Sequence, residues 1–428
     1  MRKLMSLVSV VLVLSATLVW AEPLPSAKPE QVGLSSERLD RIGPTLKAEI
    51  QKGKFPGAVV LVARKGRVAY FEAFGQRDKA AGAPMTKDAI FRIYSMTKPL
   101  ASVAAVILME DGRLVLTDPV SRFLPEFTKL QVSAPKVDPT FGRVTYALVP
   151  AEREPTIQDL LRHTSGLAYG EITVNAPVKE AYAKAGVFQP TGLPFDARGL
   201  TPAEEVAGLA KAPLAHQPGT VWEYSLASDV LGRVVEAASG MRLADFLQKR
   251  LFEPLKMDDS GFWVPKEKMG RLAQTAPDNP VKVIDISAPP KNDSGGAGGV
   301  STTMDYARFS QMLLNGGKLD GARILSRSTV ALMTSDHLAR ISTPVTPGDL
   351  LLGTPGYTFG LGFAVRQGPG VAGVPGSQGE FMWAGFAGTY FWVDPKEELV
   401  LIFLTNFSPF DRDQRWYVKT LVYQAIDN

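Results

Sequence analysis

The segment that most restricts the fold is residues 91–112, with the sequence FRIYSMTKPLASVAAVILMEDG. From Pro99 to Met109 nearly every residue is apolar or small, so a helix formed here has no polar face and has to be buried. The pattern ends at Asp111-Gly112, and glycine commonly follows the end of a helix. Pro99 is compatible with the first turn, where N–H groups have no partner within the helix. We therefore expect a core helix around which the rest of the chain packs.

Two polar residues, Ser95 and Lys98, stand at the start of this helix. Residues three apart share one helix face, so the hydroxyl and the amine are expected to meet. A serine hydroxyl is a weak nucleophile until a base accepts its proton. Burial in apolar surroundings lowers the pKa of an ammonium from its ordinary value of about 10.4 toward neutrality. The positive end of the helix dipole would also favour negative charge on the serine. Ser95 and Lys98 are therefore a candidate nucleophile and base.

The Ser-x-x-Lys spacing is weak evidence by itself, because it also describes a capped helix with a solvated lysine. A second copy runs from Ser133 to Lys136 and contains Pro135. It lies in a Pro-rich stretch without helical periodicity, where no helix would align the two side chains. This copy shows that the spacing can occur without a catalytic role. Assigning catalysis to Ser95 and Lys98 therefore needs evidence beyond their spacing.

Other motifs in the sequence give weaker evidence of a functional site. His163 and Ser165 stand two apart at a predicted helix end closed by Gly166, so their side chains are not expected to face each other. No Gly-x-Ser-x-Gly motif occurs, which disfavours a typical α/β-hydrolase. Residues 295–299 are Gly-rich, but no Gly-Lys-Ser/Thr follows, so we interpret them as a turn before a helix rather than a phosphate site.

A second candidate base is Tyr224, in the segment PGTVWEYSLASDVLG, where a turn leads into a helix. A phenol held near Lys98 would be favoured as the phenolate and would be able to relay protons. The alternative is a core tyrosine packed beside Trp222.

Composition limits the compartment and the partners. Residues 1–21 contain Arg2 and Lys3, an apolar run and small residues at a potential cleavage site, which predicts a signal peptide. A membrane anchor is the alternative, but the run is slightly short for a span. We expect a periplasmic or extracellular protein with no stable membrane insertion after processing. Its 47 basic residues become 45 against 43 acidic ones without this segment, which indicates no nucleic-acid partner.

The chain has no cysteine and three histidines, which are far apart in the sequence. Disulfides and thiolate chemistry are therefore excluded, and no metal site or cofactor is expected.

Strand patterns occur near both ends of the chain, with helices between them. Predicted strands cover Gly57–Ala63, Val68–Gly75, Tyr357–Val365 (half-buried), Phe386–Val393 and Leu399–Thr405. Predicted helices include Ser36–Lys52, one that follows Thr156, Thr201–Lys211, Ser225–Ser239, Leu243–Leu251 and a closing helix capped by Asp411. Residues 128–155 read as an irregular insertion, and 170–218 as a low-regularity stretch with one helix, Thr201–Lys211.

This order predicts an α/β protein of the α+β type. A mostly antiparallel sheet would be flanked by terminal helices and joined to an all-helical lobe, with a cleft between them. We expect residues 22–428 to form one hydrolase domain, with a sheet lobe at about 22–92 and 355–428 and a helical lobe at about 93–354.

Six motifs in order resemble those of serine β-lactamases and penicillin-binding proteins. They are SMTK from Ser95, LLRHTSGL, PGTVWEYS with Tyr224, GAGGVSTTMDYARF, YTFGLGF, and WAG from Trp383 to Gly385. The resemblance covers about residues 30–425 and is greatest to the family VIII carboxylesterases, relatives of class C β-lactamases. It implies the fold described above and an acyl-serine mechanism.

The resemblance also implies roles for individual residues. Ser95 would be the nucleophile, Lys98 its activating base, and Tyr224 the proton relay that later activates water; which base acts first stays open. The backbone N–H groups of Ser95 and Phe386 would form the oxyanion hole. Trp383 takes the place of the first residue of the Lys-Thr-Gly element.

This sequence departs from the β-lactamase pattern at two positions. Leu226 stands where Asn usually follows the tyrosine, and Trp383 replaces a cationic lysine. Both changes remove polar recognition of an amide or a carboxylate. We expect Trp383, Gly385 and Leu226 to line an apolar substrate site.

These observations predict a secreted serine esterase acting on small, short-chain carboxylic esters. One alternative is a β-lactamase or D-Ala-D-Ala peptidase, and another is a noncatalytic peptidoglycan-binding or penicillin-binding module. The sequence does not indicate an oligomeric state.

Overall fold

The computed structural model describes residues 24–189, 196–279, 281–406 and 413–427. The predicted signal peptide, 1–21, and Asp411, the predicted cap of the last helix, lie outside these residues. Within the described part, none of the helices combines the length and the apolar character needed to span a bilayer.

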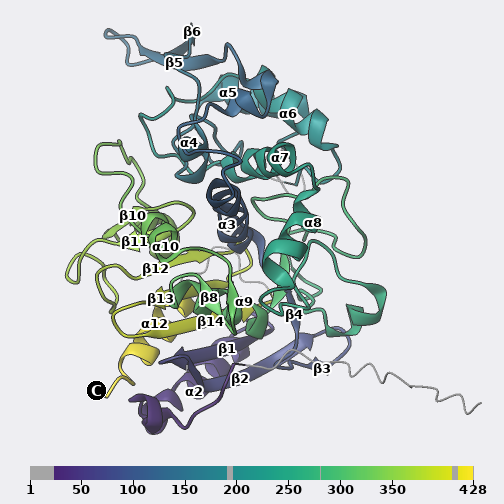
Figure 1. The fold of residues 1–428 in the computed structure, drawn as a ribbon, viewed down its shortest axis with the longest axis vertical. Helices are drawn as coiled ribbons and strands as arrows, with labels where there is room; N and C mark the ends of the chain where they lie inside the picture. Colours follow the sequence, from purple (N-terminus) through teal and green to yellow (C-terminus); the bar gives the residue numbers. More distant parts are fainter. Residues whose placement is uncertain (1–23, 190–195, 280, 407–412, 428) are drawn as a thin grey trace, which may run out of the picture.

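An eight-stranded antiparallel sheet forms one side of the molecule (Figure 1). Its order is β10-β11-β12-β13-β14-β1-β2-β3. The strands are β1 (Gly57–Arg64), β2 (Arg67–Asp78), β3 (Ala83–Pro84), β10 (Tyr357–Phe359), β11 (Ala364–Arg366), β12 (Phe381–Ala384), β13 (Tyr390–Asp394) and β14 (Leu399–Thr405). The two ends of the chain meet where β14 pairs with β1, from Ala58 opposite Thr405 to Arg64 opposite Leu399. The predicted antiparallel sheet is confirmed.

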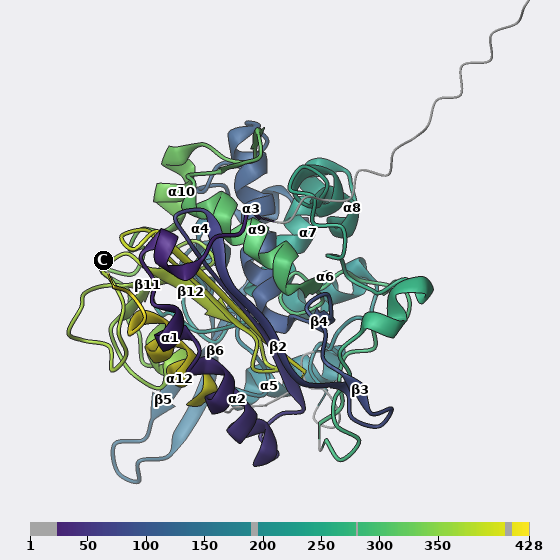
Figure 2. The same cartoon turned by 90° about the horizontal axis from the view of Figure 1, so that it is seen from below.

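Helices cover both faces of this sheet. On one face lie α1 (Ser36–Leu39), α2 (Ile42–Gln51) and α12 (Asp413–Tyr423), and on the other α9 (Thr303–Leu314) packs on β14, β1 and β13 (Figures 1 and 2). Because both faces are covered, every residue of β1 and β14 is buried. The Thr302 side chain caps α9 by accepting a hydrogen bond from the Asp305 N–H.

The predicted core helix is α3 (Thr97–Glu110), which lies between the sheet and the other helices (Figure 1). Residues 97–108 are all buried, and α3 packs against α7 (Ala227–Ser239) and α8 (Leu243–Leu247). The remaining helices are α4 (Ile157–Leu161), α5 (Ala176–Ala185), α6 (Pro202–Lys211), α10 (Arg327–Met333) and α11 (Pro347–Leu352), with a π-helical turn at Gln248–Phe252. The core helix was therefore correctly predicted, and the polar residues of its first turn, Thr97 and Lys98, are buried.

Shorter elements connect these parts. Two strands next to the start of α3, β4 (Ile90–Arg92) and β7 (Val300–Thr302), pair with each other, as do β8 (Lys318–Leu319) and β9 (Ala322–Arg323). Single 3₁₀ turns are η1 (Pro29–Val32), η2 (Tyr94–Met96), η3 (Val120–Arg122), η4 (Pro125–Phe127) and η6 (Lys266–Arg271).

Three helix and loop predictions were wrong. The insertion is not irregular, because β5 (Gln131–Val137) and β6 (Val144–Pro150) pair along their whole length as a hairpin. The 170–218 stretch holds a second helix, α5, which begins where the Asn175 side chain accepts a hydrogen bond from the Val178 N–H. The first predicted helix is interrupted at Asp40-Arg41.

The strands of the second half were also predicted inexactly. The single strand predicted over 357–365 is two strands, β10 and β11, reversed at a turn in which Gly362 has a positive φ of 94°. Both are buried rather than half-buried. Phe386 lies in a turn and not in a strand, and β12 precedes it.

Candidate active site

Ser95 lies in η2, the turn that leads directly into α3. The residue before it, Tyr94, has a positive φ of 44°, a backbone conformation that costs a bulky residue about 1 to 3 kcal/mol and is concentrated at functional sites. Tyr94 and Met96 are buried, whereas Ser95 is partly exposed. The chain thus presents the Ser95 side chain at the surface of an otherwise buried turn.

Lys98 lies one turn further on and is only 1% exposed. Its Nζ donates hydrogen bonds to Ser95 Oγ at 3.3 Å, to the Tyr169 hydroxyl at 2.9 Å and to the Gly296 carbonyl at 2.8 Å. An ammonium has three N–H donors, and these three acceptors match that number. The predicted contact between the hydroxyl and the amine is present.

Tyr224 approaches Ser95 from the loop before α7. Its hydroxyl donates to Ser95 Oγ at 2.7 Å, and its ring centroid lies 4.6 Å from Lys98 Nζ. Ser95 Oγ is therefore flanked by an amine and a phenol, each within reach of its proton. The structure brings together all three residues assigned to catalysis from the sequence, including one that is 129 positions away from the serine.

Tyr169 is a site residue that the sequence analysis missed. It is 4% exposed, its hydroxyl binds Lys98, and burial raises the pKa of its phenol well above the ordinary value, with the neighbouring Tyr224 adding to the effect. We infer that Tyr169 stays a neutral phenol and fixes the lysine. An aromatic residue just after the LLRHTSGL motif was the available signal.

Aromatic side chains form the wall beside the catalytic group. The Trp383 ring lies 5.4 Å from the Tyr224 ring and 5.2 Å from the Phe359 ring. Trp383 is 1% exposed, and within the described residues its Nε1–H has no hydrogen-bond partner. It supplies apolar area next to the Tyr224 ring.

The other predicted substrate residues lie nearby. Leu226 is 2% exposed at the start of α7, two residues after Tyr224. Gly385 follows β12 in a turn that packs on Ile93, since a Cβ on Gly385 would lie 2.3 Å from the Ile93 carbonyl oxygen. Phe386 continues that turn.

The turn holding Phe386 lies close to the residues that precede Ser95. Its ring centroid is 5.7 Å from that of Tyr94, the residue before Ser95. The Thr389 hydroxyl, in the same turn, donates to the Ile93 carbonyl at 3.3 Å. The two backbone segments predicted to hold an oxyanion are thus adjacent.

His163 and Ser165 do not form a second catalytic group. His163 Nδ1 lies 3.1 Å from Ser225 Oγ, and its ring packs 5.1 Å from that of Tyr224. Burial and the nearby Lys98 charge hold the pKa of His163 well below its ordinary value, so the imidazole stays neutral. Its ring packs against that of Tyr224.

The duplicate motif behaves as predicted. Ser133 and Lys136 lie on strand β5 and not on a helix. Ser133 Oγ is buried and lacks a hydrogen-bond partner among the described residues. No base is positioned to activate it.

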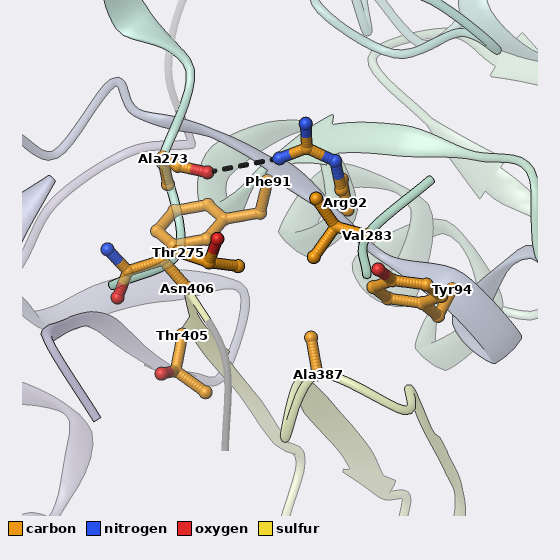
Figure 3. Close-up of a pocket in the computed structure, with 9 residues that line it drawn as sticks. All are labelled: Phe91, Arg92, Tyr94, Ala273, Thr275, Val283, Ala387, Thr405 and Asn406. Carbon is orange, nitrogen blue, oxygen red and sulfur yellow. Dashed lines mark hydrogen bonds between the residues drawn. The ribbon is translucent and has the colours of Figure 1, made fainter. Parts of the chain in front are cut away.

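A small cavity lies behind the catalytic turn, between β4 and the end of β14 (Figure 3). It is lined by Tyr94 and Ala387, and Arg92 donates across one side to the Ala273 carbonyl at 3.4 Å. Its volume of about 10 Å³ holds no more than about one water molecule. It is therefore too small for an ester.

Within the described ranges, no cluster of three or more His, Asp or Glu side chains could hold a metal ion.

Comparison with known proteins agrees with this geometry. A sequence model of the family described as Beta-lactamase matches residues 43–424. Protein Rv1367c of Mycobacterium tuberculosis (strain ATCC 25618 / H37Rv) is 37% identical over 370 residues, which cover 83% of this chain and 87% of that protein. Esterase EstB of Burkholderia gladioli is 32% identical over 379 residues, with the same two shares of 83% and 87%.

A solved structure is similar over nearly the whole fold. EstCE1, described as a hydrolase with promiscuous acyltransferase activity, superposes with a TM-score of 0.72 at 28% identity, covering 91% of this chain and 98% of its own. The resemblance inferred from six short motifs is confirmed. The chain therefore belongs to the Beta-lactamase family and is a serine hydrolase of that family.

Proposed function

We propose that this protein is a secreted serine esterase that cleaves short-chain carboxylic esters through an acyl-serine intermediate. The observation that carries the proposal is the position of Ser95 Oγ, 3.3 Å from Lys98 Nζ and 2.7 Å from the Tyr224 hydroxyl. A noncatalytic binding module has no need of an amine and a phenol placed on one serine hydroxyl. The esterase EstB and the hydrolase EstCE1 among its relatives support the same reaction class.

In the proposed reaction, Ser95 Oγ attacks the ester carbonyl carbon while its proton passes to the Lys98 and Tyr224 pair. The backbone N–H groups of Ser95 and Phe386 bind the oxyanion of the tetrahedral intermediate. The intermediate collapses with cleavage of the bond to the alkoxy oxygen, which leaves as an alcohol after receiving that proton. Tyr224 then accepts a proton from water, whose oxygen attacks the acyl carbon. The bond between that carbon and Ser95 Oγ breaks, Ser95 Oγ receives the proton, and the carboxylic acid is released.

Trp383 and Leu226 support a neutral ester as the substrate. A lysine at the first of these positions would bind a substrate carboxylate, a charge-assisted contact worth about 1.5 to 3 kcal/mol. An indole cannot supply that contact, and a leucine cannot hydrogen-bond a side-chain amide. We therefore rank β-lactams and carboxylate-terminated peptides below uncharged esters.

A direct comparison of substrates tests this proposal. One preparation is assayed with p-nitrophenyl butyrate, a chromogenic cephalosporin and a D-Ala-D-Ala peptide, with each kcat/KM divided by the uncatalysed hydrolysis rate. We expect the ester to be preferred by about a hundredfold or more. Equal or better turnover of the cephalosporin would favour the β-lactamase alternative, and no turnover of any substrate would favour the binding module.

Secretion has its own test. The predicted signal peptide, 1–21, should be removed on export, so the mature protein begins at Glu22. N-terminal sequencing of protein recovered from the periplasm checks this. Membrane-bound material that begins at Met1 would instead indicate an anchor.

A further inference from the structure

We propose that Asp229 is a positioning residue for Lys98, acting through the Gly-rich segment 294–299, an inference that rests on the proposed esterase mechanism. This segment was predicted only as a turn before a helix. In the structure it reaches into the catalytic group, because the Gly296 carbonyl accepts a hydrogen bond from Lys98 Nζ at 2.8 Å.

Asp229 holds this segment from the side of α7. One of its carboxylate oxygens accepts hydrogen bonds from the Ser294 hydroxyl at 2.6 Å and from the Gly296 N–H at 3.1 Å. Ser294 Oγ in turn accepts from the Ala297 N–H at 2.9 Å. Gly296 is thus bound at both polar groups, with its N–H on Asp229 and its carbonyl on Lys98.

The other end of the segment is tied to the turn that carries the nucleophile. The Gly299 N–H donates to Thr97 Oγ1 at 2.9 Å, and the Gly299 carbonyl accepts from the Ile93 N–H at 3.0 Å. The segment 294–299 therefore links the start of α7 to the residues on either side of Ser95. A displacement at Asp229 would be transmitted to the lysine.

Sterics explain why glycines are needed here. A Cβ on Gly296 would lie 2.3 Å from Asp229 Oδ2, and a Cβ on Gly295 would lie 2.4 Å from the Ser228 carbonyl oxygen. Any side chain at these two positions would push the segment away from α7. The glycines allow close approach to the carboxylate, which in turn fixes where the Gly296 carbonyl points.

The position of Asp229 also suits a buried negative charge. It is 4% exposed and lies in the first turn of α7, where the helix dipole favours an anion. Lys98, by contrast, hydrogen-bonds two neutral hydroxyls and a carbonyl. Asp229 therefore holds Gly296 without itself hydrogen-bonding the amine, and Nζ keeps its contact with Ser95.

The experiment compares Asp229→Asn and Asp229→Ala with the wild-type enzyme. Asparagine keeps an acceptor for the Gly296 N–H, whereas alanine removes it. With p-nitrophenyl butyrate, we expect kcat to fall about tenfold for Asp229→Asn and about a hundredfold for Asp229→Ala, with KM changed less than threefold. Labelling of Ser95 by a fluorophosphonate probe should slow in the same order.

Asp305→Asn is the matched control. Asp305 is 6% exposed, lies in the first turn of α9, and also accepts one backbone N–H, from Asp259, and one serine hydroxyl, from Ser260. Its variant should lose a similar amount of thermal stability to Asp229→Asn but keep kcat within about twofold. Assays are run at least 15 °C below the Tm of the least stable variant, and Asp229→Asn carries the test if Asp229→Ala does not fold.

A double-mutant cycle separates positioning from general damage. If Asp229 acts through the lysine, adding Asp229→Ala, or Asp229→Asn if the alanine variant does not fold, to Lys98→Ala should lower the residual kcat by less than twofold. The same loss in both backgrounds, or a kcat for the Asp229 variants within twofold of the control, would overturn the positioning role alone. Absence of Ser95 labelling in the wild-type protein would overturn the esterase mechanism and this inference together.

Discussion

Two lysines of this protein are almost completely buried, yet their surroundings differ in one decisive respect. Lys98 is 1% exposed and Lys419 is 0% exposed. The amine of each lies over two aromatic rings, at 4.6 and 5.3 Å for Lys98 and at 4.6 and 4.7 Å for Lys419. Burial and aromatic contact alone therefore do not distinguish the proposed catalytic lysine from a structural one.

The difference lies in the hydrogen-bond acceptors. Lys419 Nζ donates to both carboxylate oxygens of Glu380 at 2.8 Å, and the Tyr423 hydroxyl donates to one of them at 2.8 Å. Burial lowers the pKa of Lys419, and the Glu380 charge opposes that shift. The acceptors of Lys98 are instead neutral, and one of them is the Ser95 hydroxyl. A contacting carboxylate produces an ion pair that holds α12 to the sheet, whereas Lys98 contacts neutral acceptors that include the proposed nucleophile.

The largest expected effect is at Ser95, whose hydroxyl contacts Lys98 and has no counterpart at Lys419. Ser95→Ala should lower kcat for p-nitrophenyl butyrate by about a thousandfold or more, because the nucleophile and its bases act as a unit. The Tm should change little, since Ser95 is partly exposed. Intact-mass analysis after fluorophosphonate treatment checks the site, and modification at Ser133 or Ser165 with Ser95 untouched would contradict the assignment.

Lys98 and Tyr224 provide the next test. Lys98→Ala and Tyr224→Phe should each remove most activity, by about a hundredfold or more, and the double variant should lose little beyond either one. The reason is that both groups contact one oxygen, Ser95 Oγ. Additive losses would show that the two side chains act separately, and far-UV circular dichroism controls for unfolding.

The structural lysine should show the opposite pattern. Lys419→Met removes the cation that donates to both oxygens of Glu380 and leaves Arg366, 3.7 Å away, as the remaining cation. A buried charge left wholly unpaired typically costs about 3 to 5 kcal/mol of unfolding free energy, so with Arg366 still present we expect a loss of up to about 3 kcal/mol. Activity per folded molecule should not change. Urea unfolding measures the first quantity, and adding Glu380→Gln should recover part of the loss. A Lys419→Met protein of wild-type stability would contradict the proposed difference between the two lysines.

A substitution at Tyr169 tests whether the neutral hydrogen-bond acceptors of Lys98 matter for activity. Tyr169→Phe removes the hydroxyl 2.9 Å from Lys98 Nζ, a hydrogen bond to a charged group worth about 1.5 to 3 kcal/mol. We expect kcat to fall about tenfold to a hundredfold. Tyr182→Phe is the control, because the Tyr182 hydroxyl accepts from the nearby Ala168 N–H and is likewise buried. Equal losses in the two variants would show that Tyr169 acts only through packing.

The sequence could predict the parts of this site that are local. Ser95 and Lys98 meet because three residues make almost one helical turn, and the apolar run that follows dictates burial. Tyr224 was a candidate base because a turn leads into a helix at its position, and the resemblance to a known family then implied its role as a proton relay. Tyr169 and Gly296 contact the same amine from 71 and 198 positions away, so no local spacing connects either residue to Lys98, although Tyr169 follows the LLRHTSGL motif.

The fold, like the site, could be predicted only where a local sequence pattern is strong. Strands with continuous apolar runs, such as β1 and β14, were predicted because burial on both faces leaves a strong signal. The β5–β6 hairpin was missed because one strand contains Pro135 and much of its surface is exposed. The break between α1 and α2 falls within one continuous apolar periodicity, so the pattern could not locate it.

The smallest expected effect concerns Glu205, a buried carboxylate. Its cation, Arg233, lies 3.9 Å away, compared with 2.8 Å between Lys419 and Glu380. Burial raises the pKa of Glu205 to about 7, with Asp229 adding to the shift and Arg233, 3.9 Å away, opposing it. Since the folded protein then binds a proton that the unfolded chain releases near its ordinary pKa of 4.5, stability falls as pH rises through this window. We expect wild-type protein to lose about 1 kcal/mol more than Glu205→Gln between pH 5 and pH 6 in urea unfolding. Glutamine keeps an acceptor for Asn292, which donates to Glu205 at 2.8 Å, so the difference isolates the charge. Parallel stability curves for the two proteins would show that Glu205 is as well compensated by Arg233 as Lys419 is by Glu380.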